Sequence, residues 1–166
     1  QDSTGLGIRI EKFMWGSWTP AKVKMAVSGC PRNCAEATCK DVGVVCVDSG
    51  YEIHFAGAAG LDIKGTEVLC HARTEDEALE IIVALVQLYR EQARYLERIY
   101  KWAKRVGTAS IKANIVDDLD KRSHYFERFV YSQKFAQVDP WEERVNGKDA
   151  HEFAAMAEFG LPVAAE

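Results

Sequence analysis

Three strand patterns follow one another within residues 22–55, which read KVKMAVSGCPRNCAEATCKDVGVVCVDSGYEIHF. The first, Lys22–Ser28, begins with alternating basic and apolar side chains, a pattern typical of a strand with one buried face. The second, Val42–Val47, is almost wholly apolar, and the third, Tyr51–Phe55, alternates again. An Asp-Ser-Gly sequence at 48–50 separates the last two, and such a turn between β-rich runs predicts a hairpin.

Helical patterns dominate the rest of the sequence. Thr74 and Glu77 have the spacing of a capping box, in which each side chain bonds a free backbone N–H at the start of a helix. Apolar residues then recur at steps of three and four, so we predict one long helix from Thr74 to Gly107, ended by the glycine. The other expected elements are a helix at 6–15, a loop of small residues at 56–60, a short strand at 67–71, and helices at 110–116 and 119–135.

Strands followed by a run of helices predict an α+β fold. We expect a small antiparallel or mixed sheet followed by a helical C-terminal half. The expected parts are a β-rich half-domain at 1–73, a helical portion packed on the sheet at 74–137, and a C-terminal tail at 138–166. Together they are expected to form one structural unit. Because the chain has no initiator methionine, we expect it to be a fragment of a longer protein.

Composition and charge argue against several classes of function. The 166 residues are ordinary for a globular protein, and their formal net charge is −4. A chain without an overall positive field is a poor ligand for a phosphate backbone or an anionic membrane. Residues 1–5 also lack the basic and apolar regions of a signal peptide, and no apolar run approaches the length of a membrane span. We therefore expect a cytoplasmic protein that binds neither nucleic acid nor membrane.

The five cysteines argue against a disulfide scaffold, because their number is odd and no secretory signal accompanies them. Cys30 and Cys34 form a C-x3-C pair directly after the first strand. Thiolates on such a tight turn can ligate an iron–sulfur cluster, although two ligands are only half of a set of four. Zinc is disfavoured because neither histidine near the strands has a second histidine at helical spacing. The remaining three, Cys39, Cys46 and Cys70, are predicted to be structural.

The context of the cysteine pair resembles a known family. Residues 22–37 and 41–45 resemble the second cysteine pair of the sirohaem-dependent nitrite and sulfite reductases. Residues 74–107 and 129–141 resemble the C-terminal part of the large subunit of NAD(P)H-dependent assimilatory nitrite reductase. The resemblance implies a [4Fe–4S] cluster held by a first C-x5-C pair and a second C-x3-C pair.

The resemblance also assigns roles to individual residues. Cys30 would be a cluster ligand, and Cys34 would be both a cluster ligand and the axial thiolate of the sirohaem iron, hence the catalytic cysteine. Gly29 and Asn33 would line the cluster turn. The first cysteine pair should lie just before residue 1 and is absent from this chain.

Basic residues supply further candidates for cofactor binding. Lys22 and Lys24 are the cationic candidates for holding an anion, the alternative being a solvated strand edge. Arg32 is a candidate for a bidentate contact with a sirohaem carboxylate, or else lies on the surface. A row at helical spacing is interleaved with glutamates and is predicted to be a solvated face of mixed charge: Arg90, Arg94 and Arg98.

The expected function is that of a piece of an assimilatory nitrite reductase, which reduces nitrite to ammonium at a sirohaem bridged to a [4Fe–4S] cluster. FAD and NAD(P)H would bind the absent upstream domains of the same chain, and a small subunit would be a partner. Without the first cysteine pair, the fragment alone is expected to be inactive. The alternatives are a sulfite reductase haemoprotein fragment, a haem-free iron–sulfur electron-transfer module, and a purely structural α+β domain.

Overall fold

The computed structural model describes residues 1–148. The chain divides into two compact units, residues 1–136 and 137–166, and of the second only α6 (Pro140–Val145) belongs to a described element. The division into 1–73, 74–137 and 138–166 stays a prediction, and the tail beyond 148 lies outside the described residues. The elements of the first unit, in chain order, are α1 (Ser3–Met14), β1 (Met25–Ser28), η1 (Ala37–Cys39), β2 (Val42–Val47), β3 (Gly50–Phe55), β4 (Ala58–Ala59), β5 (Ile63–Lys64), β6 (Glu67–Ala72), α2 (Glu75–Gln92), α3 (Ile99–Val106), α4 (Thr108–Ile115) and α5 (Leu119–Ala136).

A mixed four-stranded sheet in the order β1-β2-β3-β6 confirms the predicted α+β class. The hairpin is confirmed, with Val47 opposite Gly50 in the antiparallel pair of β2 and β3. The first strand is shorter than predicted, because it begins at Met25 rather than Lys22. Just before the strand, the N–H of Lys24 donates to the side-chain carboxylate of Asp41 at 2.8 Å.

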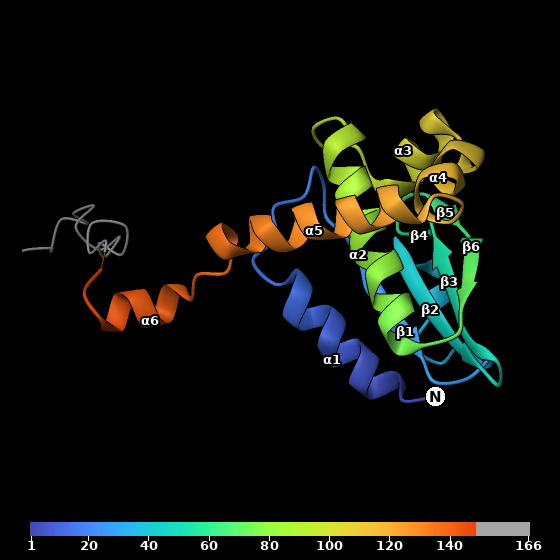
Figure 1. The fold of residues 1–166 in the computed structure, drawn as a ribbon, viewed down its shortest axis with the longest axis horizontal. Helices are drawn as coiled ribbons and strands as arrows, with labels where there is room; N and C mark the ends of the chain where they lie inside the picture. The colour runs from blue at the N-terminus through green and yellow to red at the C-terminus, as the bar shows by residue number, and fades with distance from the viewer. Residues whose placement is uncertain (149–166) are drawn as a thin grey trace, which may run out of the picture. The chain divides into compact units, whose positions relative to one another are not determined.

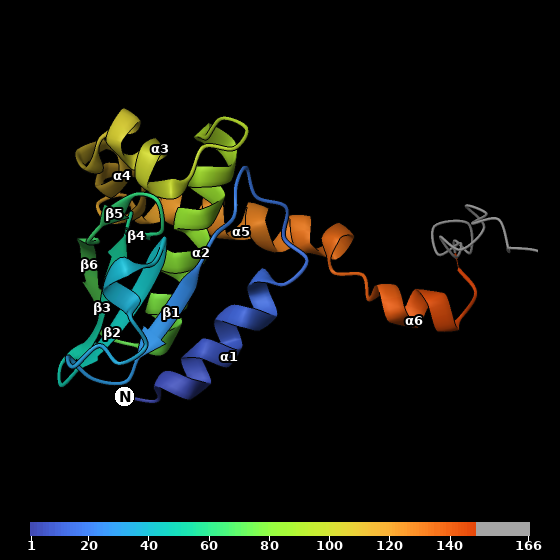
Figure 2. The ribbon, with the colours of Figure 1, turned by 180° about the vertical axis from the view of Figure 1, so that it is seen from behind.

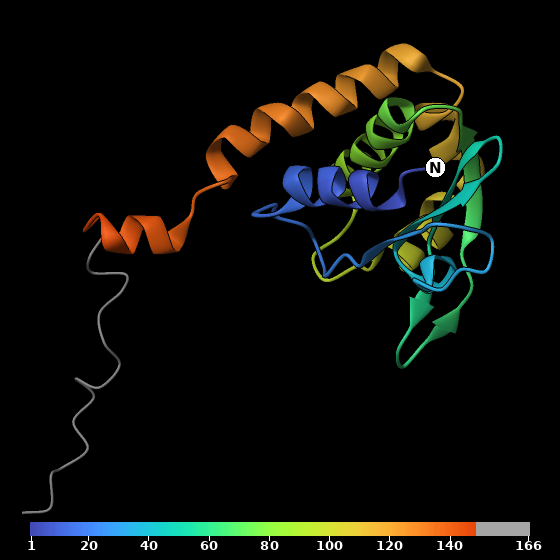
Figure 3. The same cartoon turned by 90° about the horizontal axis from the view of Figure 1, so that it is seen from below.

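The prediction that residues 56–60 form a loop is only partly right, because residues 58–59 form a strand. Two short strands, β4 and β5, pair antiparallel with Ala58 opposite Lys64. They form the green hairpin that projects from the rest of the fold in Figure 3. Its tip exposes two large apolar side chains, Leu61 and Ile63.

One face of the sheet forms the core with α2. Figure 1 shows α2 lying between the sheet and α5, and this position explains why nearly every residue from Ala78 to Tyr89 is buried. Val44 and Ile53 are among the strand residues that point into this core. Within the described residues, no helix combines the length and the apolar character needed to cross a membrane.

The prediction of one long helix from Thr74 to Gly107 is wrong. Thr74 does cap the start of α2, accepting the N–H of Glu77 at 3.2 Å. Gly107, at φ 89°, does end a helix, but that helix is α3. Between them the chain leaves the helix after Gln92 and resumes it at Ile99. Leu96 has a left-handed backbone at φ 61° and donates its N–H to the carbonyl of Pro20 at 2.9 Å. A contact with a segment distant in sequence therefore overrides the local helical period.

Glu97 organises this helix break. Its carboxylate accepts the Arg94 N–H at 2.9 Å and both Nε and Nη2 of Arg105, at 2.8 and 2.6 Å. The hydrogen bonds from Arg105 outweigh the opposing effect of burial and lower the pKa of Glu97 to about 2.

We expect Glu97→Gln to weaken the acid dependence of stability. A carboxylate with a depressed pKa stabilises the folded state above its ordinary pKa, and that contribution is lost as the pH falls toward its folded value. Here the window runs from about 4.5 down to about 2. Urea unfolding at a series of pH values should therefore show a shallower acid decline for the variant. Glu127→Gln, at an exposed carboxylate on α5, is the control, and an equal change in both variants would contradict the assignment.

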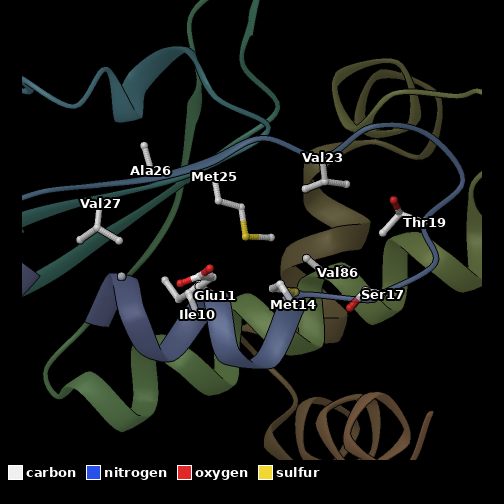
Figure 4. A pocket seen from close by; sticks show the side chains of 11 residues that line it. Ile10, Glu11, Met14, Ser17, Thr19, Val23, Met25, Ala26, Val27 and Val86 are labelled. Carbon is white, nitrogen blue, oxygen red and sulfur yellow. The ribbon is translucent and has the colours of Figure 1, made fainter. Parts of the chain in front are cut away.

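An apolar groove separates α1 from β1, with a volume of about 360 Å³. Figure 4 shows Met25 pointing from the strand toward α1, with Met14 and Val86 closing the other side. None of the residues predicted to bind a cofactor lines it. The predicted cofactor-binding residues therefore lie outside this groove.

Candidate functional site

The two cysteines lie in the connection between β1 and β2. These strands are parallel neighbours, with Ser28 beside Val45, so the chain must return along the sheet before it can enter β2. The connection at 29–41 makes that return and carries η1. In Figure 2 it lies in front of the sheet, on the face away from α2.

Two consecutive turns shape the cysteine segment. The N–H of Asn33 donates to the carbonyl of Cys30 at 3.0 Å, and the N–H of Glu36 donates to the carbonyl of Asn33 at 2.9 Å. Asn33 and Glu36 both have left-handed backbone, at φ 56° and 57°. Asparagine tolerates left-handed backbone better than most residues, so Asn33 is well suited to its position in the first of these two turns. We call residues 29–36 the cysteine turn.

Close packing of η1 on β2 anchors the far end of this connection. A Cβ atom at Gly43 would lie 2.1 Å from the carbonyl oxygen of Ala37. Only glycine therefore allows η1 to approach the strand this closely.

Gly43→Ala is expected to lower the free energy of unfolding by about 1–3 kcal/mol, the usual cost of forcing extra volume into a packed site. The clash is with backbone, so a side-chain rotation cannot relieve it. Gly7→Ala in α1 is the matched control, since a Cβ there meets nothing within 4 Å. Urea unfolding would measure both, and equal stability of the Gly43 variant and the wild type would contradict the packing argument.

The thiols of Cys30 and Cys34 are both exposed and free, so they remain available to a metal. A cavity of about 240 Å³ lies beside Cys30 and is also lined by Gln1 and Gly29. Among residues 1–148, no three His, Cys, Asp or Glu side chains come together as a metal site. The donor set fits half of a four-thiolate cluster site, which is the half that a C-x3-C pair supplies.

The other predicted site residues are less closely grouped. Gly29 lines the cavity beside Cys30, and Arg32 is exposed within the cysteine turn. Lys22 and Lys24 are also exposed, but they precede β1, whereas the cysteine turn follows its other end. Lys24 lines a second cavity, of about 280 Å³, beside the β4–β5 hairpin.

The remaining cysteines differ from Cys30 and Cys34 in their surroundings, although Cys46 lines the same cavity as Cys30. Cys46 is buried in β2, and burial raises its pKa. Burial also raises the pKa of Cys70, to about 11. Cys39 is half-buried and donates its thiol hydrogen to the carbonyl of Glu36 at 3.2 Å. A raised pKa disfavours the thiolate that a metal requires, so Cys46 and Cys70 are poor candidates for ligands.

Arg98, whose side chain is 29% exposed, forms an ion pair with Asp41. Asp41 is fully buried, and its carboxylate accepts Nε and Nη2 of Arg98 at 3.2 and 2.6 Å, as well as the N–H of Lys24. The predicted solvated arginine face is therefore wrong for Arg98. It is also wrong for Arg90, whose guanidinium lies over the ring of Phe129 and has a pKa lowered by burial. The position of Asp41 directly before the apolar strand β2 could have indicated this pair, because a carboxylate that is buried with the strand needs a charged or hydrogen-bonding partner.

Known proteins match most of this chain. A family model described as the nitrite and sulphite reductase 4Fe-4S domain matches residues 1–123. The chain is 42% identical over 148 residues to the NAD(P)H nitrite reductase of Bacillus subtilis, and 30% identical over 151 residues to the large subunit of the NADH nitrite reductase of Escherichia coli. The alignments cover 89% and 90% of this chain but only 18% of each relative.

A sulfite reductase is also similar. The chain is 33% identical over 116 residues to the assimilatory-type sulfite reductase of Nitratidesulfovibrio vulgaris, which covers 70% of the chain and 53% of that relative. The family match takes in the cysteine turn and the whole sheet, and the predicted resemblance is confirmed. This chain belongs to the nitrite and sulphite reductase 4Fe-4S domain family.

Proposed function

We propose that this chain is the C-terminal cluster-binding part of an NAD(P)H-dependent nitrite reductase, which reduces nitrite to ammonium. The observation that carries the proposal is the cysteine turn, which exposes both thiols of the C-x3-C pair at the surface. Similarity to two nitrite reductases over about nine-tenths of the chain supports nitrite as the substrate. The chain spans 18% of those relatives, so the other two cluster ligands are expected in the remainder of the protein.

In this proposal Cys30 and Cys34 would hold a [4Fe–4S] cluster, and Cys34 would also hold the sirohaem. When bound, these cofactors would supply the electron transfer that reduction of nitrite requires. This chain's contribution is to present two thiolates and to keep their turn in place. Gly29 lines the cavity beside Cys30, and a Cβ atom at this position would lie 2.9 Å from the Ser3 hydroxyl oxygen.

The basic residues have supporting roles. Arg32 is exposed beside the thiols, and its guanidinium can bind a carboxylate of the macrocycle through two parallel hydrogen bonds. Lys24 and Lys22 provide positive charge at the opposite end of β1, from which they can attract an anion or a carboxylate. Binding of FAD and NAD(P)H to other domains, a small-subunit partner and a cytoplasmic location remain predictions.

Cofactor analysis of the full-length protein that contains this chain tests the proposal. Protein purified without oxygen is expected to contain iron, sulfide and sirohaem, and to reduce nitrite with a low-potential electron donor. Sirohaem absorbance with faster reduction of sulfite than nitrite would instead establish the second candidate, a sulfite reductase, which the similarity to the sulfite reductase favours. Cluster absorbance without sirohaem would identify a haem-free electron-transfer module. Protein that lacks iron and sulfide would overturn all three.

A further inference from the structure

The cysteine turn is held together by hydrogen bonds that use neither ligand sulfur. Both of its reversals are closed by backbone bonds that involve Asn33, as donor to Cys30 and as acceptor from Glu36. Cys30 and Cys34 are exposed and free, and their sulfurs are not among the hydrogen-bonding atoms of this network. The turn therefore owes its shape to its own polar groups.

The side chain of Asn33 ties the two ends of this segment together. Its Oδ1 accepts the hydroxyl of Ser28 at 3.1 Å, and its Nδ2 donates to the hydroxyl of Thr38 at 2.6 Å. Ser28 is the last residue of β1 and is 2% exposed, while Thr38 lies in η1, which packs on β2. Ser28 also accepts the N–H of Ala35 at 3.3 Å. One amide thus links both fixed elements across the loop that carries the cysteines.

We propose that Asn33 is the positioning residue of the cysteine turn: its amide bridge from Ser28 to Thr38 holds Cys30 and Cys34 in place before any metal binds. The use of this geometry by a cluster rests on the proposed function. A turn ordered in advance does not lose its conformational freedom at the moment of ligation, so more of the binding energy is retained. Asn33 acts through the cysteines and makes no contact with the cofactor in this role, because its amide atoms are already bonded to Ser28 and Thr38.

Three substitutions separate the backbone from the side chain of Asn33. Asn33→Gly keeps the freedom to adopt φ 56° but removes the bridge. Asn33→Ala removes the bridge and also disfavours that backbone. Asn33→Asp keeps the Oδ1 acceptor and the tolerance of left-handed backbone, and it replaces the Nδ2 donor by a second oxygen, to which the Thr38 hydroxyl can donate. Asn114→Ala on α4 is the control for loss of an asparagine outside the turn.

Hydrogen exchange of the metal-free 166-residue chain tests the bridge directly. We expect the Asn33 and Glu36 amides to lose protection about 10-fold in Asn33→Gly, the effect of one side-chain hydrogen bond, and more in Asn33→Ala. Asn33→Asp should restore most of the protection, and Asn114→Ala should leave it unchanged. Equal protection of these amides in the wild type and Asn33→Gly would overturn the proposal.

The reduction potential of the cluster in the full-length protein tests whether the bridge positions the thiolates. We expect Asn33→Gly to shift the potential and Asn33→Asp to bring it back, because cluster potentials respond to hydrogen bonding and solvent exposure at the sulfurs. A potential that is unchanged in Asn33→Gly, despite lost protection, would overturn the positioning role. Wild-type protein without iron and sulfide would instead overturn the proposed function, while the exchange experiment would still decide whether Asn33 holds the turn.

Discussion

Replacing Arg98 with methionine is expected to lower the free energy of unfolding by about 3–5 kcal/mol, the usual cost of leaving a buried charge without its partner. The Asp41 carboxylate is fully buried and would keep only the N–H of Lys24 as a hydrogen-bond donor. Because Asp41 leads into β2 and Arg98 leads into α3, the variant should loosen the sheet and the helix break together. Urea unfolding followed by circular dichroism measures the loss.

Arg128→Met provides the matched control. Arg128 also binds a carboxylate through Nε and Nη2, at 2.8 and 3.0 Å from Glu91, but both side chains are more than one-third exposed. An exposed pair of this kind contributes at most about 1 kcal/mol. Losses of similar size in the two variants would contradict the importance of burial at Asp41.

Serine in place of Cys34 is expected to remove sirohaem and nitrite reduction from the full-length protein. In the proposed site this sulfur is a ligand of both cofactors. Replacing it should therefore lower cofactor affinity and activity by more than the roughly 10–100-fold that is typical when a residue that only contacts a metal ligand is replaced. Stability of the polypeptide itself should change little, because the Cys34 side chain is exposed. Iron, sulfide and sirohaem content, measured with nitrite reduction, gives the result.

Cys39→Ser tests whether the effect belongs to the C-x3-C pair. Cys39 follows in the same connection, and its thiol donates to the carbonyl of Glu36, a bond that a serine hydroxyl can also make. We expect this variant to keep its cofactors. Retention of full iron and sulfide by Cys34→Ser, or their loss in Cys39→Ser, would show that the ligands have been wrongly assigned.

Local patterns were sufficient for much of the fold. The hairpin of β2 and β3 was predicted from two strand patterns and the turn at 48–50, and the start of α2 was predicted from Thr74, because both signals act between residues close in sequence. The helix break at 93–98 was missed for the opposite reason. The apolar period continues through it, and the chain departs from the helix through the contact of Leu96 with Pro20 and the ion pair of Arg98 with Asp41.

For the candidate site, the sequence around Cys30 and Cys34 was enough to predict the family, and the assignment of the two cysteines as cluster ligands stays a prediction. The two thiols belong to one turn, so their proximity follows from the chain itself. How that turn is held was decided only in three dimensions. The resemblance placed Asn33 at the cluster turn, and its side-chain amide bonds Ser28 and Thr38. Gly43 allows η1 to pack on β2 because a side chain there would collide with the backbone of Ala37. The period of apolar residues predicts local helices and strands from neighbours in the sequence. The partner of a buried polar group depends instead on which distant segments pack together, and the sequence pattern does not contain that information.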